Sequence, residues 1–233
     1  MSNIKRFISF GFAIMIVLSI IVWFIYAPDR ELEKYKISSP LKQLKEEQVN
    51  KVLDKYVGKS FWKLNIEKIH SDLVHVDWVY KAEVIRKWPN ALIVKLEEQV
   101  PVVRWGDNAL LNQSGDVFYP YHISEFSDYV VLRGEDVDAK KMLAKLVVFQ
   151  EKFNPLNWVI KQVDKRVDKG WLIKFVTGQE VIVGREGWES ILDRFIISYP
   201  KVKKRIRNNA QVYDLRYSDG FVVKILDKEV IAN

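Results

Sequence analysis

The chain of 233 residues contains no cysteine and only three histidines. Without cysteine it has no disulfide, no thiolate metal site and no thiol nucleophile. His70 and His75 are five positions apart, so they do not share a helix face as a pair of metal ligands would, and His122 stands alone. The sequence also lacks a glycine-rich phosphate loop, a nucleophile elbow and an HExxH motif. These absences argue against an enzyme, a cofactor and a metal centre.

The charge of the chain is only a weak signal. Lys and Arg outnumber Asp and Glu by 37 to 30, for a net charge of +7, which favours anionic partners without specifying one. A basic run after Pro200 comprises Lys201, Lys203, Lys204, Arg205 and Arg207. Such a run suits phosphate contacts with nucleic acid. A solvated face or a dock for acidic groups is the simpler interpretation, and we expect no nucleic-acid partner.

An apolar run near the N-terminus is the first feature with a definite meaning. Residues 7–27 carry no charge and are rich in Ile, Val and Phe, and about 20 helical residues span the roughly 30 Å hydrocarbon core of a bilayer. A cleaved signal peptide is the alternative, but its apolar core is normally about 7–15 residues long. We therefore predict a transmembrane helix. Lys5 and Arg6 place residues 1–6 in the cytoplasm. Everything after about residue 28, beginning with a connector at 28–34, is then expected outside it.

A small module is predicted for residues 35–100. Two apolar stripes indicate helices, the first ending at Gly58 and the second capped by Asn65. With a strand near 35–38 and a hairpin that turns at Pro89-Asn90, the order is strand, helix, helix, strand, strand. Period-two alternation gives the hairpin one buried and one wet face. The buried face is predicted to comprise Tyr80, Ala82, Val84, Leu92, Val94 and Leu96.

Residues 101–233 are predicted to form an α+β domain with a mostly antiparallel sheet and flanking helices. Its helices are expected at 136–153 and 187–199, the second stopped by Pro200. The last strand has only one sequence neighbour, so we expect it at the edge of the sheet, where its unpaired backbone groups would accept a strand from another protein. Strands are expected at 102–105, 109–112, 116–119, 129–132, 158–166, 171–176, 180–183, 211–217 and 221–226.

Three blocks of this sequence resemble the FtsQ/DivIB family of bacterial cell-division proteins, whose first extracytoplasmic module is a POTRA domain. The second block is 98–105, followed by Asn112, Gly115 and Val117-Phe118, and the third is Asp214-Leu215-Arg216-Tyr217 with Gly220. There are three departures from the family pattern. A glycine is missing after the first strand, where 37–40 reads Ile-Ser-Ser-Pro; the turn reads Ser218-Asp219-Gly220 in place of Asp-Ser-Gly; and Ile225 stands where an aromatic residue is sometimes found late in the last strand. The first block comprises Gly58, Phe61, Leu73, Trp78, Val79, Ala82, Val84, Arg86, Trp88, Pro89, Leu92 and Ile93.

The resemblance implies a non-enzymatic divisome scaffold at the septum, anchored in the bacterial inner membrane by one pass and mostly periplasmic. It implies that an FtsB/FtsL-type subcomplex is held by strand addition to the C-terminal edge strand. FtsK, FtsW/FtsI-type and FtsN-type proteins are further expected partners, together with a weak homodimer. The partner-binding residues carried over by the resemblance are Arg216, Tyr217, Ser218, Asp219, Gly220, Phe221, Val222, Val223, Lys224, Ile225 and, by looser alignment, Arg166.

Other interpretations stay open at this point. A POTRA-bearing transport or chaperone component would bind client strands, although such proteins usually carry several of these modules and this chain has one. A periplasmic enzyme would need a polar cleft with converging groups. For Tyr217 the alternative to a partner contact is a packed strand aromatic, because it shares parity with Tyr213 and Leu215.

Overall fold

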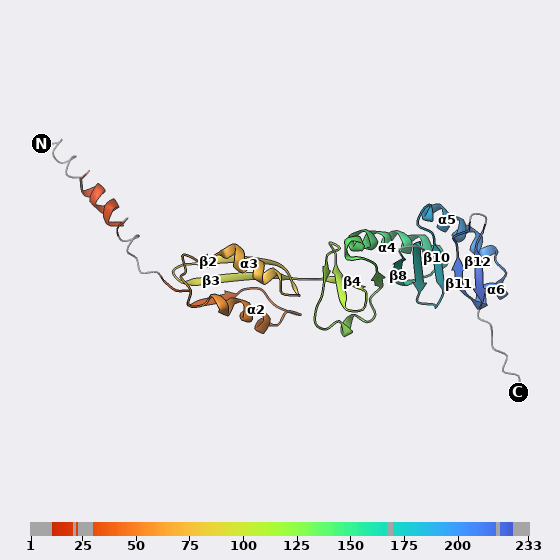
Figure 1. The fold of residues 1–233 in the computed structure, drawn as a ribbon, viewed down its shortest axis with the longest axis horizontal. Coiled ribbons are helices and arrows are strands. Elements are labelled where there is room, and N and C mark those ends of the chain that lie inside the picture. Colours follow the sequence, from red (N-terminus) through yellow and green to blue (C-terminus); the bar gives the residue numbers. More distant parts are fainter. Residues whose placement is uncertain (1–10, 21, 23–29, 167–169, 218–219, 226–233) are drawn as a thin grey trace, which may run out of the picture. The chain divides into compact units, whose positions relative to one another are not determined.

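The computed structural model describes residues 11–20, 22, 30–166, 170–217 and 220–225 (Figure 1). The chain divides into two compact units, 1–98 and 99–233. Residues 11–20 and 22 are helical, and their side chains are exposed. Within the ranges that are described, no helix combines the length and the apolarity that crossing a bilayer requires. Much of the predicted transmembrane segment 7–27 lies outside these ranges, so it stays a prediction.

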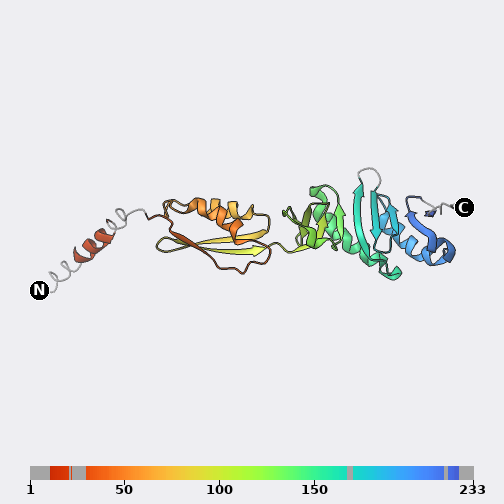
Figure 2. The same cartoon turned by 90° about the horizontal axis from the view of Figure 1, so that it is seen from below.

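The first unit contains a three-stranded sheet with two helices on one of its faces (Figure 2). The strand order is β1-β3-β2, with β3 antiparallel to β2 and parallel to β1. This is the predicted sequence of strand, helix, helix, strand and strand. The elements are β1 (Lys34–Ile37), α2 (Glu46–Leu53), a 3-10 turn (Asp54–Tyr56), α3 (Ile66–Val74), β2 (Val79–Lys87) and β3 (Ala91–Glu98).

Polar side chains fix the ends of these elements. The Asn65 side chain accepts a hydrogen bond from the backbone N–H of Lys68 at 2.9 Å, so it caps α3 as predicted. Glu98, the last residue of β3, accepts bonds from the backbone N–H groups of residues 42–44 at 2.7, 3.2 and 3.0 Å. A carboxylate that gathers three backbone donors holds the loop before α2 against the end of the sheet.

The prediction that Tyr80 faces the core is wrong. Val79 of β2 pairs with Glu98 of β3, and Lys81 pairs with Glu97. Tyr80 therefore has no partner position in β3 and forms a bulge in β2. The bulge shifts the alternation by one position. Val79 therefore points inward with 2% of its surface exposed, whereas Tyr80 is 44% exposed. Beyond the bulge Ala82 is buried, as the alternation predicts.

The second unit is built on one mixed sheet. Its described helices are α4 (Ala139–Phe153), α5 (Trp188–Ser198) and α6 (Lys204–Asn209). Helix α6 was not predicted, because it lies in the basic run that we interpreted as a solvated face. The strands are β4 (Pro101–Trp105), β5 (Ala109–Asn112), β6 (Val117–Phe118), β7 (Val131–Arg133), β8 (Ile160–Arg166), β9 (Gly170–Phe175), β10 (Glu180–Val183), β11 (Ala210–Asp214) and β12 (Val222–Ile225).

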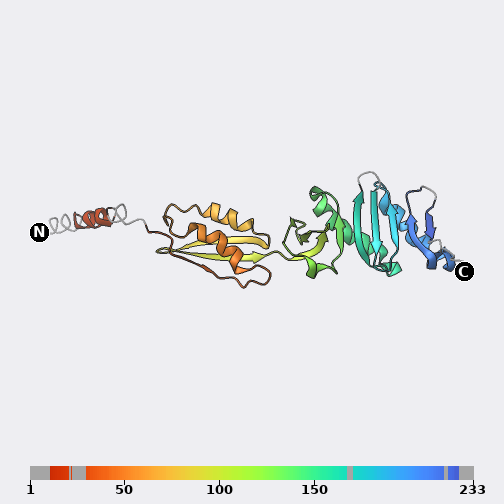
Figure 3. The ribbon, with the colours of Figure 1, turned by 60° about the horizontal axis from the view of Figure 1, so that its bottom comes forward.

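Among the described residues this sheet has nine strands, in the order β12-β11-β10-β9-β8-β7-β4-β5-β6 (Figure 3). Five neighbouring pairs are antiparallel. Three pairs, β4–β7, β7–β8 and β10–β11, are parallel. Helices α4 and α5 supply Phe149 and Phe195 to the same buried cluster as the strand residues Ile173 and Val181, so both helices pack on the sheet.

An aromatic cluster lies beneath the C-terminal end of this sheet. The rings of Trp158 and Phe195 lie 5.7 and 5.3 Å from that of Tyr213, between centroids. Tyr213 is completely buried, and this burial raises the pKa of its hydroxyl. Removing one such ring typically costs about 3–5 kcal/mol. The cluster therefore gives β11, and the strand beside it, a well-packed support.

Candidate partner-binding edge

Strand β12 lies at one end of the nine-stranded order and pairs with β11 alone among the described residues. The two strands are antiparallel, with Tyr213 opposite Val223 and Asp214 opposite Val222. A register shift between Ala210 and Val212 marks a bulge in β11. The other side of β12 is the open side of the sheet in this part of the chain, and a strand edge presents a row of backbone N–H and C=O groups.

Alternate side chains seat β12 on the aromatic cluster. The ring of Phe221, just before the strand, lies 5.2 Å from Phe195 and 6.1 Å from Tyr213, between centroids. Val223 is also partly buried against the core. Val222 points the other way and is 44% exposed, and Lys224 is exposed as well. The first half of the strand is thus fixed from one face and accessible on the other, as alternation requires. Ile225 shares the parity of Val223 but is 48% exposed, so the end of the strand is not held in this way.

The carboxylate of Asp214 holds the end of β11. It accepts bonds from Arg216 at both side-chain oxygens, from Nε at 2.8 Å and from Nη2 at 2.5 Å. The Arg216 backbone N–H also donates to it, at 3.2 Å. These bonds to Arg216 hold the pKa of Asp214 below its ordinary value although burial opposes this, and the Asp214 partner raises the pKa of Arg216. Arg216 is exposed, but its guanidinium already has an acidic partner within the chain.

The predicted strand at 211–217 is too long, because β11 ends at Asp214. The bond from the Arg216 backbone to the Asp214 side chain explains this end. The Leu215 backbone N–H still donates to the Ile182 carbonyl at 2.8 Å. At Arg216 the backbone N–H turns to the Asp214 side chain instead, as in an Asx turn. Tyr217 therefore lies beyond the strand. It does not share the burial of Tyr213 and is 53% exposed, so it is not a packed strand aromatic.

The connection from β11 to β12 brings most of the predicted residues to one place. The carbonyl of Tyr217 accepts a bond from Arg194 Nη2 at 3.3 Å, which ties the connection to α5. Gly220 and Phe221 follow, and both are partly buried. Ser218 and Asp219 lie outside the described residues, so nothing tests their predicted role. Asp214 and Arg194 hold this connection in place, and we did not predict either role. The Asp-x-Arg spacing of Asp214 and Arg216 could have indicated their ion pair.

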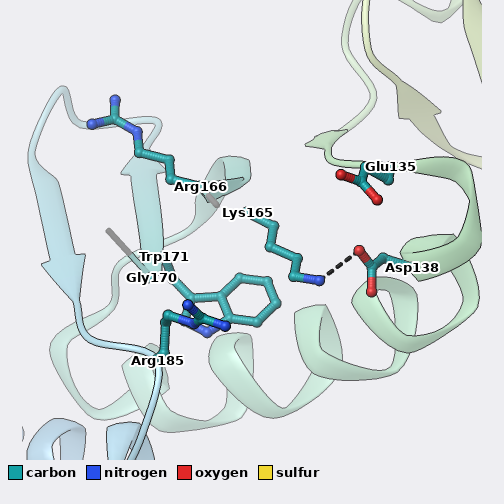
Figure 4. Close-up of a pocket in the computed structure, with 7 residues that line it drawn as sticks. All are labelled: Glu135, Asp138, Lys165, Arg166, Gly170, Trp171 and Arg185. Atoms are coloured by element: carbon teal, nitrogen blue, oxygen red, sulfur yellow. Dashed lines mark hydrogen bonds and ion pairs between the residues drawn. The ribbon is translucent and has the colours of Figure 1, made fainter. Parts of the chain in front are cut away.

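Arg166 is exposed at the end of β8, three strands away from β11 in the sheet order. The strand pairing places Arg166 at the same end of the sheet as Asp214. Three strand spacings separate β8 from β11, a distance of about 14 Å across the sheet. It lines a hollow of about 250 Å³ that also contains Glu135, Asp138, Lys165, Gly170, Trp171 and Arg185 (Figure 4). In Figure 4 the Arg166 guanidinium points away from the ion pair of Lys165 and Asp138.

The chemistry of this end of the sheet is that of a basic rim. Arg166 at the end of β8, Arg185 after β10 and Arg216 after β11 lie on it. Lys165 is paired with Asp138 at 2.5 Å. In the described parts of the chain no group of three His, Cys, Asp or Glu residues converges as a metal site would require. A basic rim attracts acidic groups. The open side of β12, at another place in the sheet, can pair with an extended segment.

Comparison with known proteins gives matches over both units. A family model described as "POTRA domain, FtsQ-type" matches residues 30–99, and one described as "Cell division protein FtsQ/DivIB, C-terminal" matches residues 103–216. A protein of Nitrosospira multiformis named "Cell division protein FtsQ" is 30% identical over 207 residues, which cover 87% of this chain and 86% of the relative. Proteins of the same name from Methylomonas methanica and Coxiella burnetii are 28% and 23% identical, covering 84% and 96% of this chain and 79% and 93% of the relatives.

Proposed function

The chain belongs to the FtsQ/DivIB family of cell-division proteins, and from that premise we propose that it is a non-enzymatic scaffold of the division machinery. In this proposal residues 7–27 anchor it in the bacterial inner membrane. The N-terminus is cytoplasmic, and the domains at 35–100 and 101–233 are periplasmic at the septum. In this role the chain binds other division proteins at the septum and holds them together. What it supplies is a binding surface and not a reacting group.

The proposed binding reaction is strand addition to β12. A segment of an FtsB-like partner lies along the open side of the strand and completes its hydrogen bonds, and an FtsL-like protein is held through that partner. The observation that carries this proposal is the position of β12 at the end of the sheet order, with Val222 and Lys224 exposed on it. Backbone pairing supplies affinity, and the side chains beside it supply selectivity.

Two side chains are proposed to select the partner. Tyr217 offers an exposed aromatic ring, a residue type enriched among binding hot spots. Arg166 offers a charge for an acidic residue of the partner, at the same end of the sheet. The Arg216 guanidinium is committed to Asp214, so we propose that it mainly shapes the connection between β11 and β12. FtsK, FtsW/FtsI-type and FtsN-type proteins are proposed as further partners of the periplasmic part.

The test measures the dissociation constant of purified full-length chain in detergent with the purified FtsB-type protein. Val223→Pro removes a backbone donor of β12, and Val223→Ala keeps it, so the two variants are matched. We expect Val223→Pro to weaken binding at least about tenfold, which corresponds to about 1.4 kcal/mol, and Val223→Ala to have a much smaller effect. Tyr217→Ala is expected to weaken binding as well, and Tyr121→Ala, at a ring that is 88% exposed elsewhere, is its control.

Two results would contradict the proposal. Unchanged binding by both Val223→Pro and Tyr217→Ala, with near-ultraviolet circular dichroism showing intact folding, would eliminate the edge-strand mechanism. Equal affinity for the FtsB-type segment and for unrelated strand-forming peptides would instead favour a component that binds client strands without selecting among them.

A further inference from the structure

The first unit carries two tryptophans side by side on its surface. The rings of Trp62 and Trp88 lie 4.3 Å apart between centroids. Trp62 is 42% exposed and Trp88 is 58% exposed. Single exposed apolar residues are ordinary on a soluble protein, but adjacent large ones form a patch that usually marks a contact surface. We call this feature the tryptophan pair.

The tryptophan pair is held in place by contacts with the core of the first unit. Both rings pack edge-on against Phe61, with centroids 6.1 and 6.2 Å away, and Phe61 is completely buried. Arg86 on β2 donates from Nη2 to the Leu64 carbonyl at 2.6 Å, which fixes the loop that contains Trp62. The rings are therefore presented by a rigid support, which lowers the entropic cost of using them in a contact.

The chain enters the first unit at this same point. The Phe61 backbone N–H donates to the Arg30 carbonyl at 2.7 Å, and the Glu33 N–H donates to the Asn90 carbonyl at 3.0 Å. Residue 30 is thus bonded to the residue before Trp62. The apolar run ends at residue 27, and three extended residues reach at most about 11 Å. If residues 7–27 cross the bilayer as proposed above, the tryptophan pair lies close to the membrane surface.

The charge around the tryptophan pair suits the same surface. The segments that hold it, 30–33, 58–63 and 86–90, carry five basic residues and two acidic ones. Lys63 and Lys87 flank the two tryptophans directly in sequence and are exposed. Lys and Arg close to an anionic bilayer surface are attracted to its charged headgroups. The basic excess therefore favours a bilayer that contains anionic lipids.

We propose that the tryptophan pair and its basic surround form a membrane-docking surface that seats the first unit on an anionic bilayer. Tryptophan is enriched at the boundary between lipid and water, where its ring is apolar and its N–H stays hydrogen-bonded. Docking at the point of chain entry would restrict how the unit tilts on its anchor. The inference rests on the proposed membrane anchor at residues 7–27.

The absence of native cysteine allows a single fluorescent label to be placed at will. Asn90→Cys labels the turn beside the tryptophan pair, and Gln43→Cys labels the opposite pole, since Gln43 bonds to Glu98 at the far end of β3. Full-length chain is reconstituted in phosphatidylcholine vesicles with a quarter phosphatidylglycerol and a lipid-borne nitroxide quencher. We expect quenching of the label to be several-fold stronger at residue 90 than at residue 43.

Variants then connect the quenching to the proposed surface. Trp62→Ala with Trp88→Ala is expected to lower quenching at residue 90 to the level seen at residue 43. Tyr80→Ala, at an exposed ring near the opposite end of β2, is the matched control and should change nothing. Lys63→Glu with Lys87→Glu leaves the rings in place. It is expected to reduce docking at least about tenfold on vesicles with phosphatidylglycerol and to have little effect on pure phosphatidylcholine.

The outcomes separate the inference from the proposal beneath it. Equal, weak quenching at residues 90 and 43 in a chain that floats with the vesicles overturns the docking surface and leaves the anchor intact. A chain that does not float with the vesicles overturns the anchor itself. Circular dichroism reports whether the double tryptophan variant folds, and if it does not, the double lysine variant decides, with unchanged quenching counting against the proposal.

Discussion

Arg216 closes a two-bond ion pair on Asp214, only two residues earlier, at the point where the chain leaves β11. The Asp214 side chain is 10% exposed and that of Arg216 is 42% exposed. The pair therefore sits across the boundary between the sheet and solvent. Because the same carboxylate accepts the Arg216 backbone N–H, it both ends one strand and directs the chain toward β12.

Breaking this pair should destabilise the second unit in a pH-dependent way. The pKa of Asp214 is lowered in the folded chain, so its contribution is complete above about pH 4, the ordinary range of a carboxyl, and is lost as pH falls through the folded value. We expect Arg216→Ala to cost about 1 kcal/mol near pH 7, after allowance for the exposed arginine, and to lower Tm by about 3 °C.

Thermal unfolding of the full-length chain in detergent, followed by circular dichroism at pH 7 and at pH 2.5, checks this expectation. Arg133→Ala is the control, since its pair with Asp107 is 46% and 80% exposed and should be worth about 0.5 kcal/mol or less. A Tm difference between the natural chain and Arg216→Ala that is as large at pH 2.5 as at pH 7 would contradict the assignment.

Phe221 should determine how firmly β12 is seated. Its ring contacts Phe195 and Tyr213, so Phe221→Ala removes packing from the strand without opening the centre of the core. We expect the local stability of β12 to fall by about 2 kcal/mol. Amide hydrogen exchange at residues 222–225 should then become about 30-fold faster. Val222→Ala, at an exposed side chain, should leave the exchange rates nearly unchanged, and equal rates in the two variants would count against this role.

Gly170 should be the less replaceable of two glycines in the same sheet region. It has φ +78°, and a Cβ there would lie 2.2 Å from the Val183 carbonyl oxygen. Gly178 has φ +93° but open space around it. We expect Gly178→Ala to cost about 1–2 kcal/mol for the left-handed backbone alone and Gly170→Ala to cost about 3 kcal/mol or more. Thermal unfolding of both variants measures the difference, and equal losses would show that β10 can move aside.

The sequence was most informative where local signals agreed. In the first unit the helix stripes, the Asn65 cap and the Pro89-Asn90 turn are each read from residues close together in the sequence. They agree on one order of elements, which the structure has. The bulge at Tyr80 was not predictable by alternation. A bulge depends on how β3 pairs across from it, and that information does not lie in β2.

The second unit was harder to predict because its sheet order is not the order of the chain. The parallel pairs β4–β7, β7–β8 and β10–β11 join strands separated by other strands or by helices, and no local pattern specifies such pairing. Helix α6 was missed because Lys203, Arg205 and Arg207 dominate the segment and leave no apolar stripe.

The candidate edge was predictable in position but not in detail. That β12 has one sequence neighbour was enough to expect it at the end of the sheet, which is where it lies. The parity of Tyr217 with Tyr213 did not decide its environment, because Asp214 ends the strand between them. The partner roles of Tyr217 and Arg166 stay predictions.

In the part of the chain that the structure describes, the two ends of the nine-stranded sheet are unequal. At one end β6 has two residues, Val117–Phe118, and at the other β12 has four. Very short edge strands are poor templates for pairing, so β12 is the better of the two for strand addition. Two copies that paired through β12 would form a closed twofold dimer and leave neither copy free to take another strand there. Self-association by this route and binding of a different protein would then compete for the open side of β12. The relative concentrations of the two proteins, and not affinity alone, would set which assembly forms.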